Sequence, residues 1–114
     1  MRRTQLGEFE EVVMLAVGIL CESAYGVSIK TEIEKRTGRG VSVGALQSAL
    51  KRLEEKGFLR SREGEGTAER AGRPKKYFSI TMEGKKALET ARDMRNNMWN
   101  DIPGIAFDLK LIFS

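Results

Sequence analysis

The sequence predicts a mainly α-helical fold with a small β-ribbon. Three observations predict it. Apolar residues between 42 and 59 recur at spacings of three and four, which places them on one stripe of a helix. A glycine-containing stretch from 64 to 74 separates two strand-like segments, and a second long amphipathic stretch runs from 81 to 101. With 114 residues, the chain is most naturally one domain with a modest core.

The stretch from 42 to 59 is expected to form a helix with well-marked ends. Ser42 can accept a hydrogen bond from a first-turn amide, and Gly57 suits the left-handed residue just past a helix end. Lys56 would lie favourably at the negative end of the helix dipole. The inward stripe consists of Val43, Leu46, Leu50 and Leu53.

The opposite face of this helix is unusual, because its first turn carries small or amide-bearing residues instead of Glu and Lys. Small residues let a helix enter a DNA major groove, where donors and acceptors read base edges and cations further along contact phosphates. An ordinary amphipathic core helix is the alternative on this segment alone. The outward residues are Gly44, Ala45, Gln47, Ser48, Lys51, Arg52 and Glu55.

The middle of the chain carries most of the positive charge. The formal net charge is +4 and the isoelectric point is near 9.4. Between 39 and 62 six basic residues stand against two acidic ones, and further cations follow at 73, 75 and 76. This distribution indicates a nucleic-acid surface, and a solvated charged face is the alternative that charge alone leaves open.

Composition argues against several classes of site. The chain has no histidine, so we expect no zinc site, no histidine-based triad and no histidine pH switch. Cys21 is the single cysteine, which rules out an intrachain disulfide, and its apolar neighbours predict a buried side chain. Acidic residues interrupt the apolar run from 6 to 20, so neither a signal peptide nor a membrane span is expected. The sequence predicts a cytoplasmic protein without a metal, a cofactor or a membrane partner.

The first helix is expected from 6 to 22 and is apolar on more than one face. Such a helix has more apolar surface than one small core can bury. It therefore either packs partly on a second chain or lies at the centre of its own core.

The second helix is expected from 27 to 36, and Gly38 and Gly40 then form a short turn before Ser42. Two helices joined in this way, the second with an uncharged first turn, form a helix-turn-helix. The residues expected to point inward are Val27, Ile29 and Ile33.

A β-ribbon is expected directly after the helix-turn-helix. Residues 58–63 could form a strand, residues 76–80 are rich in aromatics and alternate as a returning strand does, and the glycine-containing loop between them ends in cations. A ribbon in this position is a wing, whose tip can lie along a minor groove or follow phosphates. We define the wing as residues 64–75 and expect it to be anchored by Arg73, Lys75 and Lys76.

The last helix is expected to begin after a Thr81 cap and to end before Pro103. It is longer than the core of one winged helix can cover, so its far half is expected to pair with another chain. Interface packing and a ligand cavity both remain open for Met94, Met98 and Trp99. Its apolar stripe consists of Ala87, Leu88, Ala91, Met94, Met98, Trp99 and Ile102.

The tail from 104 to 114 is strongly apolar for a chain end. Its alternation predicts an extended segment, although a short helix fits as well. An exposed apolar tail favours aggregation, so the tail is expected to dock on its own or a partner subunit.

Three sequence blocks resemble the PadR-type family of bacterial winged-helix transcription regulators, over roughly residues 6–100. The resemblance implies a homodimer that binds an inverted-repeat operator, usually as a repressor, with release by a ligand in some members. The single C-terminal helix is similar to that of the smaller members. The blocks are Tyr25-Gly26 with Ile29, then Leu46, Leu50, Arg52-Leu53-Glu54 and Gly57-Phe58-Leu59, and finally Gly72-Arg73, Lys75-Lys76-Tyr77-Phe78, Ile80-Thr81 and Gly84.

The chain departs from the family pattern in the recognition helix, residues 42–56. Many members carry Thr-Leu-Tyr where this chain has Ala45-Leu46-Gln47, so the hydroxyl and the aromatic ring are lost. Gln47 can still bond a base edge or a phosphate. The usual contact pattern therefore does not carry over.

The expected function is that of a dimeric, DNA-binding repressor, with double-stranded DNA and a second copy as partners and a small apolar or aromatic effector as a further option. The expected parts are a DNA-binding winged helix-turn-helix at 1–81, a dimerisation helix at 82–103 and an apolar tail at 104–114. A winged-helix module that binds an acidic protein is the alternative, and an enzyme is the weakest reading because no nucleophile–base pair is present. The DNA-binding residues are expected to be Ser42, Gly44, Ala45, Gln47, Ser48, Lys51, Arg52, Arg73, Lys75 and Lys76. The dimer interface or ligand cavity is expected to include Leu6, Phe9, Val13, Met94, Met98, Trp99 and Ile102.

Overall fold

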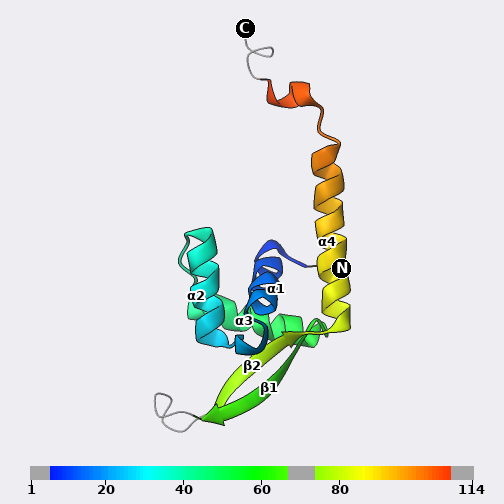
Figure 1. Ribbon diagram of the computed structural model, residues 1–114. Helices are drawn as coiled ribbons and strands as arrows, with labels where there is room; N and C mark the ends of the chain where they lie inside the picture. Colours follow the sequence, from blue (N-terminus) through cyan, green and yellow to red (C-terminus); the bar gives the residue numbers. More distant parts are fainter. Residues whose placement is uncertain (1–5, 67–73, 109–114) are drawn as a thin grey trace.

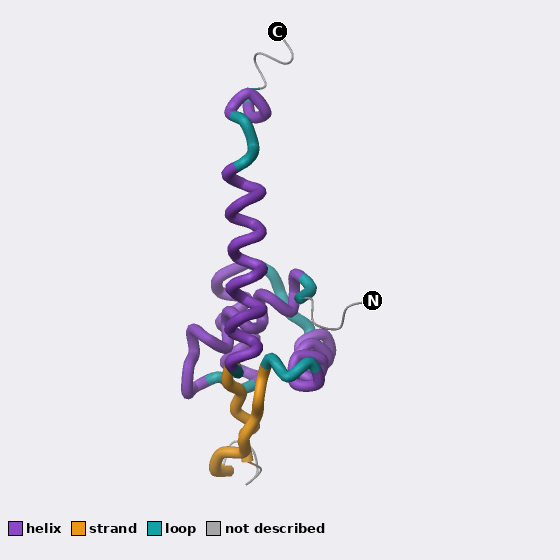
Figure 2. Tube along the Cα trace, turned by 90° about the vertical axis from the view of Figure 1, so that its right-hand side faces the viewer, coloured by secondary structure: helices purple, strands orange, loops and turns teal. Residues whose placement is uncertain are grey.

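The computed structural model describes residues 6–66 and 74–108, with backbone only at 65 and 66. Three helices pack together, a β-hairpin extends from their base, and a long helix leaves the hairpin in the direction opposite to its tip (Figures 1 and 2). This arrangement confirms the predicted mainly α fold with a small β-ribbon. The elements are α1 (Glu8–Leu20), η1 (Cys21–Ser23), α2 (Gly26–Thr37), α3 (Val43–Glu55), β1 (Leu59–Gly66), β2 (Pro74–Ile80), α4 (Met82–Asn100) and η3 (Gly104–Phe107).

Helix α1 lies at the centre of the core, where it contacts α2, α3 and β2. Its face toward these elements is fully buried, while Leu15 and Ile19 on its other side are 48% and 50% exposed. The prediction of two apolar faces is therefore confirmed, and one of them remains open on this chain. The fully buried large side chains of the core are Val13, Met14, Val17, Ile29, Leu46, Leu50 and Leu53.

The helix-turn-helix is formed by α2 and α3, and two of its predicted inward residues are wrong. Val27 and Val43 are 62% and 61% exposed. Each stands in the first turn of its helix, where the helix extends past the core, so its place on the stripe does not bury it. The remaining predicted inward residues, from Ile29 and Ile33 to the three leucines of α3, are buried as expected.

Cys21 is exposed, which corrects the prediction of a buried thiol. It follows the last residue of α1 with a φ of 56°, and its backbone N–H bonds to the carbonyl of Val17. The chain turns out of the helix at this residue, so the periodicity of α1 no longer applies to it.

The predicted helix ends are confirmed. Ser42 Oγ accepts from the N–H of Ala45 at 3.0 Å, and Thr81 Oγ1 accepts from the N–H of Gly84 at 3.0 Å. Gly57 adopts a φ of +80°, a conformation that glycine takes without steric cost. Thr81 also donates its hydroxyl to the carbonyl of Gly57 at 2.6 Å, which joins the start of α4 to the end of α3.

The hairpin strands extend further toward the loop than predicted. Antiparallel pairing runs from Leu59↔Ile80 to Gly66↔Pro74, with an irregularity between Glu63 and Gly66. The hairpin is also tied to the turn before α2, because Phe78 donates its N–H to the carbonyl of Ala24 at 2.8 Å. Residues 67–73, which include Arg73, lie outside the described part of the chain.

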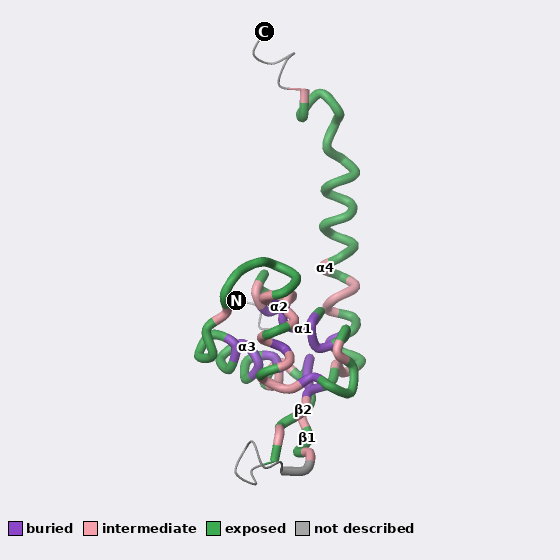
Figure 3. The backbone as a smooth tube through the Cα atoms, turned by 60° about the vertical axis from the view of Figure 1, so that its left-hand side comes forward, coloured by how far each residue is buried: buried purple, intermediate pink, exposed green. Residues whose placement is uncertain are grey.

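Helix α4 packs its apolar side chains on the body through its first half, and Arg95 further along adds an ion pair to Glu11 of α1. Gly84 is buried, and a Cβ at this position would lie 2.2 Å from the carbonyl oxygen of Phe58. Ala87 and Leu88 pack against the core, after which almost the whole helix is exposed (Figure 3). No helix of the described residues is long and apolar enough to cross a membrane.

The described part of the tail is a short 3-10 helix, which was the second of the two predicted conformations. The ring of Phe107 lies 5.6 Å from that of Trp99, at an angle of 40°. This contact brings the start of the tail against α4 of the same chain. Residues 109–114 lie outside the described residues, so the expected docking of the whole tail stays a prediction.

Candidate nucleic-acid interface

The outward face of α3 is fully available to a partner. Packing of Leu46, Leu50 and Leu53 into the core turns the opposite side of the helix to solvent. The described residues of the predicted recognition helix surface are exposed without exception: Ser42, Gly44, Ala45, Gln47, Ser48, Lys51 and Arg52. An uncharged first turn followed by two cations therefore forms one continuous exposed strip.

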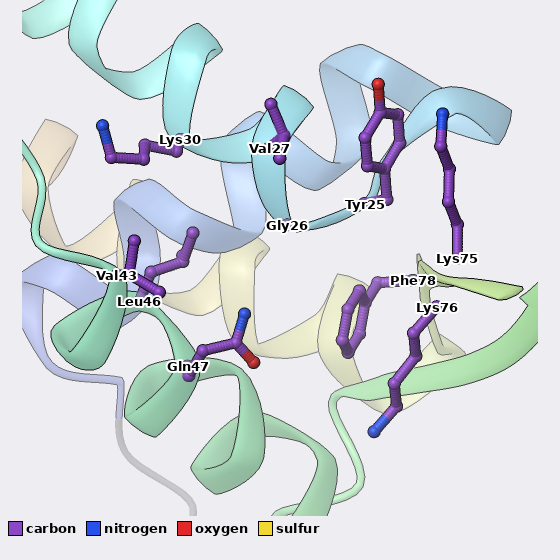
Figure 4. Close-up of a pocket in the computed structure, with 10 residues that line it drawn as sticks. All are labelled: Tyr25, Gly26, Val27, Lys30, Val43, Leu46, Gln47, Lys75, Lys76 and Phe78. Atoms are coloured by element: carbon purple, nitrogen blue, oxygen red, sulfur yellow. The ribbon is translucent and has the colours of Figure 1, made fainter. Parts of the chain in front are cut away.

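A hollow of about 260 Å³ lies beside this strip, between the starts of α2 and α3 and the base of β2 (Figure 4). Gln47 projects from α3 into this hollow toward the start of α2. A Cβ at Gly26 would lie 3.4 Å from Gln47 Nε2, so the absence of a side chain there makes room for the amide. The hollow is lined by Tyr25, Gly26, Val27, Lys30, Val43, Leu46, Gln47, Lys75, Lys76 and Phe78.

Two tyrosines and two cations stack at the base of the wing. The rings of Tyr25 and Tyr77 meet edge-on at 5.6 Å, with a backbone bridge between the two residues. Lys75 Nζ lies 4.1 Å from the centre of the Tyr25 ring, and the Arg62 guanidinium lies 4.8 Å from that of Tyr77. Cation–π contacts of this kind restrict where a long cationic side chain can go. Lys75 is therefore held at the edge of the hollow, next to the start of α2.

Lys76, one of the predicted wing anchors, forms an ion pair with α3. Its Nζ lies 3.1 Å from Glu54 Oε1, which joins β2 to α3, although the side chain remains 56% exposed. Ser61 Oγ also donates to Glu54 at 2.6 Å. The Ser61 hydrogen bond lowers the pKa of Glu54, burial opposes it, and Lys76 lowers it further, with a net lowering.

Glu10 is the functional candidate that sequence reasoning missed. Its buried carboxylate accepts from Arg52 Nε at 3.0 Å and from Lys56 Nζ at 2.8 Å, both on α3. Burial raises the pKa of Glu10, but hydrogen bonds from Gly7 N–H, Lys56 and Arg52 outweigh it, so the pKa is lowered overall. In the sequence this residue is visible only as an acidic interruption of an apolar helix, which gives no hint of its partners.

The predicted interface residues fall into two groups. Val13 is fully buried in the core of its own chain, so it cannot face a second copy, and Leu6 and Phe9 are half-buried against the same core. By contrast, the side chains of α4 predicted for the interface are open to solvent: Met94, Met98, Trp99 and Ile102 are 52%, 65%, 66% and 38% exposed.

A groove of about 420 Å³ separates α1 from α4 and contains two apolar residues that the predicted interface did not include. Leu15 and Leu88 lie in it among charged side chains, and the Arg95–Glu11 ion pair at 2.9 Å closes one side. No cluster of metal-binding side chains occurs among the residues that the structure describes.

Comparison with known proteins identifies the family. Residues 15–90 match the model of the transcriptional regulator PadR-like family. Among curated protein sequences, none shows a significant match to the chain.

Solved structures agree with the family match. A PadR family transcriptional regulator from Eggerthella lenta is 26% identical, with a TM-score of 0.66 over 94% of this chain and 88% of that one. A PadR family regulator from Clostridium difficile is also 26% identical, with a TM-score of 0.63 over 81% and 92% of the two chains. A transcriptional regulator from Clostridium thermocellum shows 25% identity and a TM-score of 0.65 over 78% and 83%. The chain therefore belongs to the PadR-like family of transcriptional regulators.

Proposed function

We propose that this protein is a dimeric repressor that binds an inverted-repeat operator through its recognition helix, residues 42–56, and its wing, residues 64–75. The observation that carries the proposal is the exposed strip on α3, whose first turn is uncharged and whose next turn is cationic. A surface meant only for water would not need small residues in its first turn. A helix that enters a major groove does, because each added side chain holds it away from the base edges.

Different residues of the strip would make the base contacts and the phosphate contacts. Gly44 and Ala45 allow close approach, and Gln47 and Ser48 supply donors and acceptors for base edges. Lys51 would contact a phosphate beside the groove, because it is exposed and makes no ion pair with a described residue. At the hairpin, Lys75 would contact the phosphate backbone of the DNA from its position over the Tyr25 ring.

We propose that residues 82–103 form the dimerisation helix. The far half of α4 carries exposed Met94, Met98 and Trp99, and such an apolar surface requires a partner. A two-fold dimer places two recognition helices so that their half-sites are about 10 bp apart, centre to centre. This symmetry is the reason for expecting an inverted repeat.

An effector would bind near the same residues. Methionines adapt to ligands of varied shape, and Trp99 offers a flat ring for stacking, so a small apolar or aromatic compound fits best. Titration of the protein with a panel of planar aromatic compounds should change the fluorescence of Trp99, the single tryptophan. Unchanged fluorescence across the panel would remove the effector from the proposal.

The test of the proposed function is binding to the DNA upstream of the protein's own gene. Affinity is measured across a salt series, with random duplex of the same length as competitor. Specific retention that weakens steeply with salt is the expected result. Weak binding without sequence preference would instead favour a winged-helix module that binds an acidic protein.

A further inference from the structure

Glu10 of α1 lies beneath the far end of the recognition helix and contacts it twice. Its carboxylate is 7% exposed and binds Arg52 Nε at 3.0 Å and Lys56 Nζ at 2.8 Å. It also accepts from the N–H of Gly7 at 2.8 Å, which ties it to the start of its own helix. Three donors from different directions fix the position of this carboxylate.

Arg52 is bonded through one edge only. Its side chain is 51% exposed, and among the described residues only its Nε has a hydrogen-bond partner. Because the guanidinium is planar and rigid, a bond at Nε fixes the plane of the whole group. Because no described residue bonds the terminal nitrogens, they can bind something outside the chain, on the same outward face as Ser48 and Lys51.

We propose that Glu10 is a positioning residue for DNA binding, which holds Arg52 Nε so that the terminal guanidinium nitrogens meet a backbone phosphate. The inference rests on the proposed function, since it assigns a partner to the same helix. A guanidinium group that is already oriented loses little side-chain conformational entropy on binding, which favours a bidentate contact with a phosphate. The charge of Lys56 neutralises that of the Glu10 carboxylate, so Glu10, Lys56 and Arg52 together carry a net charge of one positive unit near the DNA.

The next residue in the chain provides a matched control. Glu11 accepts from Arg95 Nε at 3.2 Å and Nη2 at 2.9 Å, so it binds α4, and among the described residues it makes no hydrogen bond to α3. Glu10→Gln and Glu11→Gln remove the same charge from neighbouring positions of α1. Only the first should alter what Arg52 does.

The experiment is a double-mutant cycle on DNA affinity. Glu10→Gln, Arg52→Ala, the double variant and Glu11→Gln are titrated with the upstream duplex across a salt series. We expect Arg52→Ala to weaken binding about tenfold and to lower the salt slope by about one. Glu10→Gln should weaken binding about fivefold, Arg52→Ala should add less than about twofold in that background, and Glu11→Gln should stay within about twofold of the wild type.

Three results of the cycle would overturn the proposal. The first is that the effects of Glu10→Gln and Arg52→Ala multiply as independent changes do. The second is that Glu10→Gln binds as tightly as the wild type or more tightly. The third is that Glu11→Gln reproduces the loss. Failure of the proposed function looks different, because the wild type itself would then bind the upstream duplex weakly and without preference over random duplex.

A spectroscopic measurement separates orientation of Arg52 from general support of the helix. In ¹⁵N spectra of the free protein, the Arg52 Nε–H should be protected from exchange in the wild type and in Glu11→Gln, and unprotected in Glu10→Gln. Lys56→Met removes the other cation but leaves the Glu10–Arg52 bond, so it should keep both the protected signal and the contribution of Arg52 to affinity. If Lys56→Met abolishes that contribution, Glu10 acts by anchoring the helix and the proposal is wrong. This variant also gives a decisive result should Glu10→Gln fail to fold.

Discussion

The two ends of α3 differ in how they are bonded to the other elements of the molecule. At the first end, the outward residues Gly44, Ala45 and Ser48 are exposed, and no hydrogen bond or ion pair among the described residues joins them to another element. At the far end, carboxylates hold the cations: Glu10 binds Arg52 and Lys56, and Glu54 binds Lys76 of β2. The difference teaches that the part proposed to read bases has no ion pair to another described element, while the far end of the helix is held by ion pairs from α1 and β2.

The inward side of α3 shows the same contrast between its ends and provides the largest expected effect. Leu50→Ala removes a fully buried side chain and should lower the free energy of unfolding by about 3 kcal/mol. Val43→Ala, on the same stripe of the sequence, should change it by less than about 0.5 kcal/mol, because Val43 is 61% exposed. Urea denaturation of the two variants checks this, and equal losses would mean that the first turn of α3 is buried in solution.

Gln47→Ala tests whether the free end of α3 reads sequence. Loss of a base contact should reduce discrimination at one base pair by about 1–2 kcal/mol and leave affinity for random duplex nearly unchanged. Competition against a set of single-base operator variants measures this. An equal loss for every DNA would show that Gln47, which projects into the hollow at the start of α2, supports the interface without reading a base.

Much of this arrangement could be predicted from the sequence, because it depends on near neighbours. The caps at Ser42 and Thr81 involve residues three positions apart, and the buried stripe of α3 follows from helical spacing alone. The wing was visible for the same reason, since its strands flank one short loop. These features need no knowledge of how the helices cross.

The parts that escaped prediction depend on long-range packing. Glu10 and Arg52 are 42 residues apart, and only the crossing of α1 over α3 brings them together. Val27 and Val43 have the spacing of core residues but stand where their helices pass the edge of the core. Cys21 has apolar neighbours but lies just beyond the end of α1. The spacing of residues along one helix predicts which of them share a face. It does not predict how far the neighbouring elements extend over that face, or which residues of another helix lie opposite.

A free cation and a paired cation should differ in their effect on DNA affinity. Lys51→Ala removes an exposed ammonium and should weaken binding to all sequences alike, with a salt slope lower by about one. Lys76→Ala should lower the slope by clearly less than one, because Glu54 already neutralises Lys76 at 3.1 Å. Salt titrations with random duplex compare the two directly, and equal slopes would mean that the Lys76–Glu54 pair opens when DNA binds.

The smallest expected effect concerns the pH dependence of the bonds that join Glu54 of α3 to Lys76 and Ser61 of the hairpin. Ser61 and Lys76 hold the pKa of Glu54 below its ordinary value of 4.5, so the ionised carboxylate stabilises the folded state. Because the pKa is lowered on folding, this stabilisation is present above pH 4.5 and is lost as the pH falls through the lower, folded-state value.

Glu54→Gln should therefore lower the free energy of unfolding at pH 7 by less than about 1 kcal/mol, with the difference from wild type vanishing in acid. The pKa of Glu10 is lowered as well, but Glu10 is present in both proteins, so the difference between the two denaturation curves isolates Glu54. A difference that persists at low pH would show that Glu54 acts through packing and not through its charge, and would leave Glu10 as the single ionic tie at the far end of α3 among the described residues.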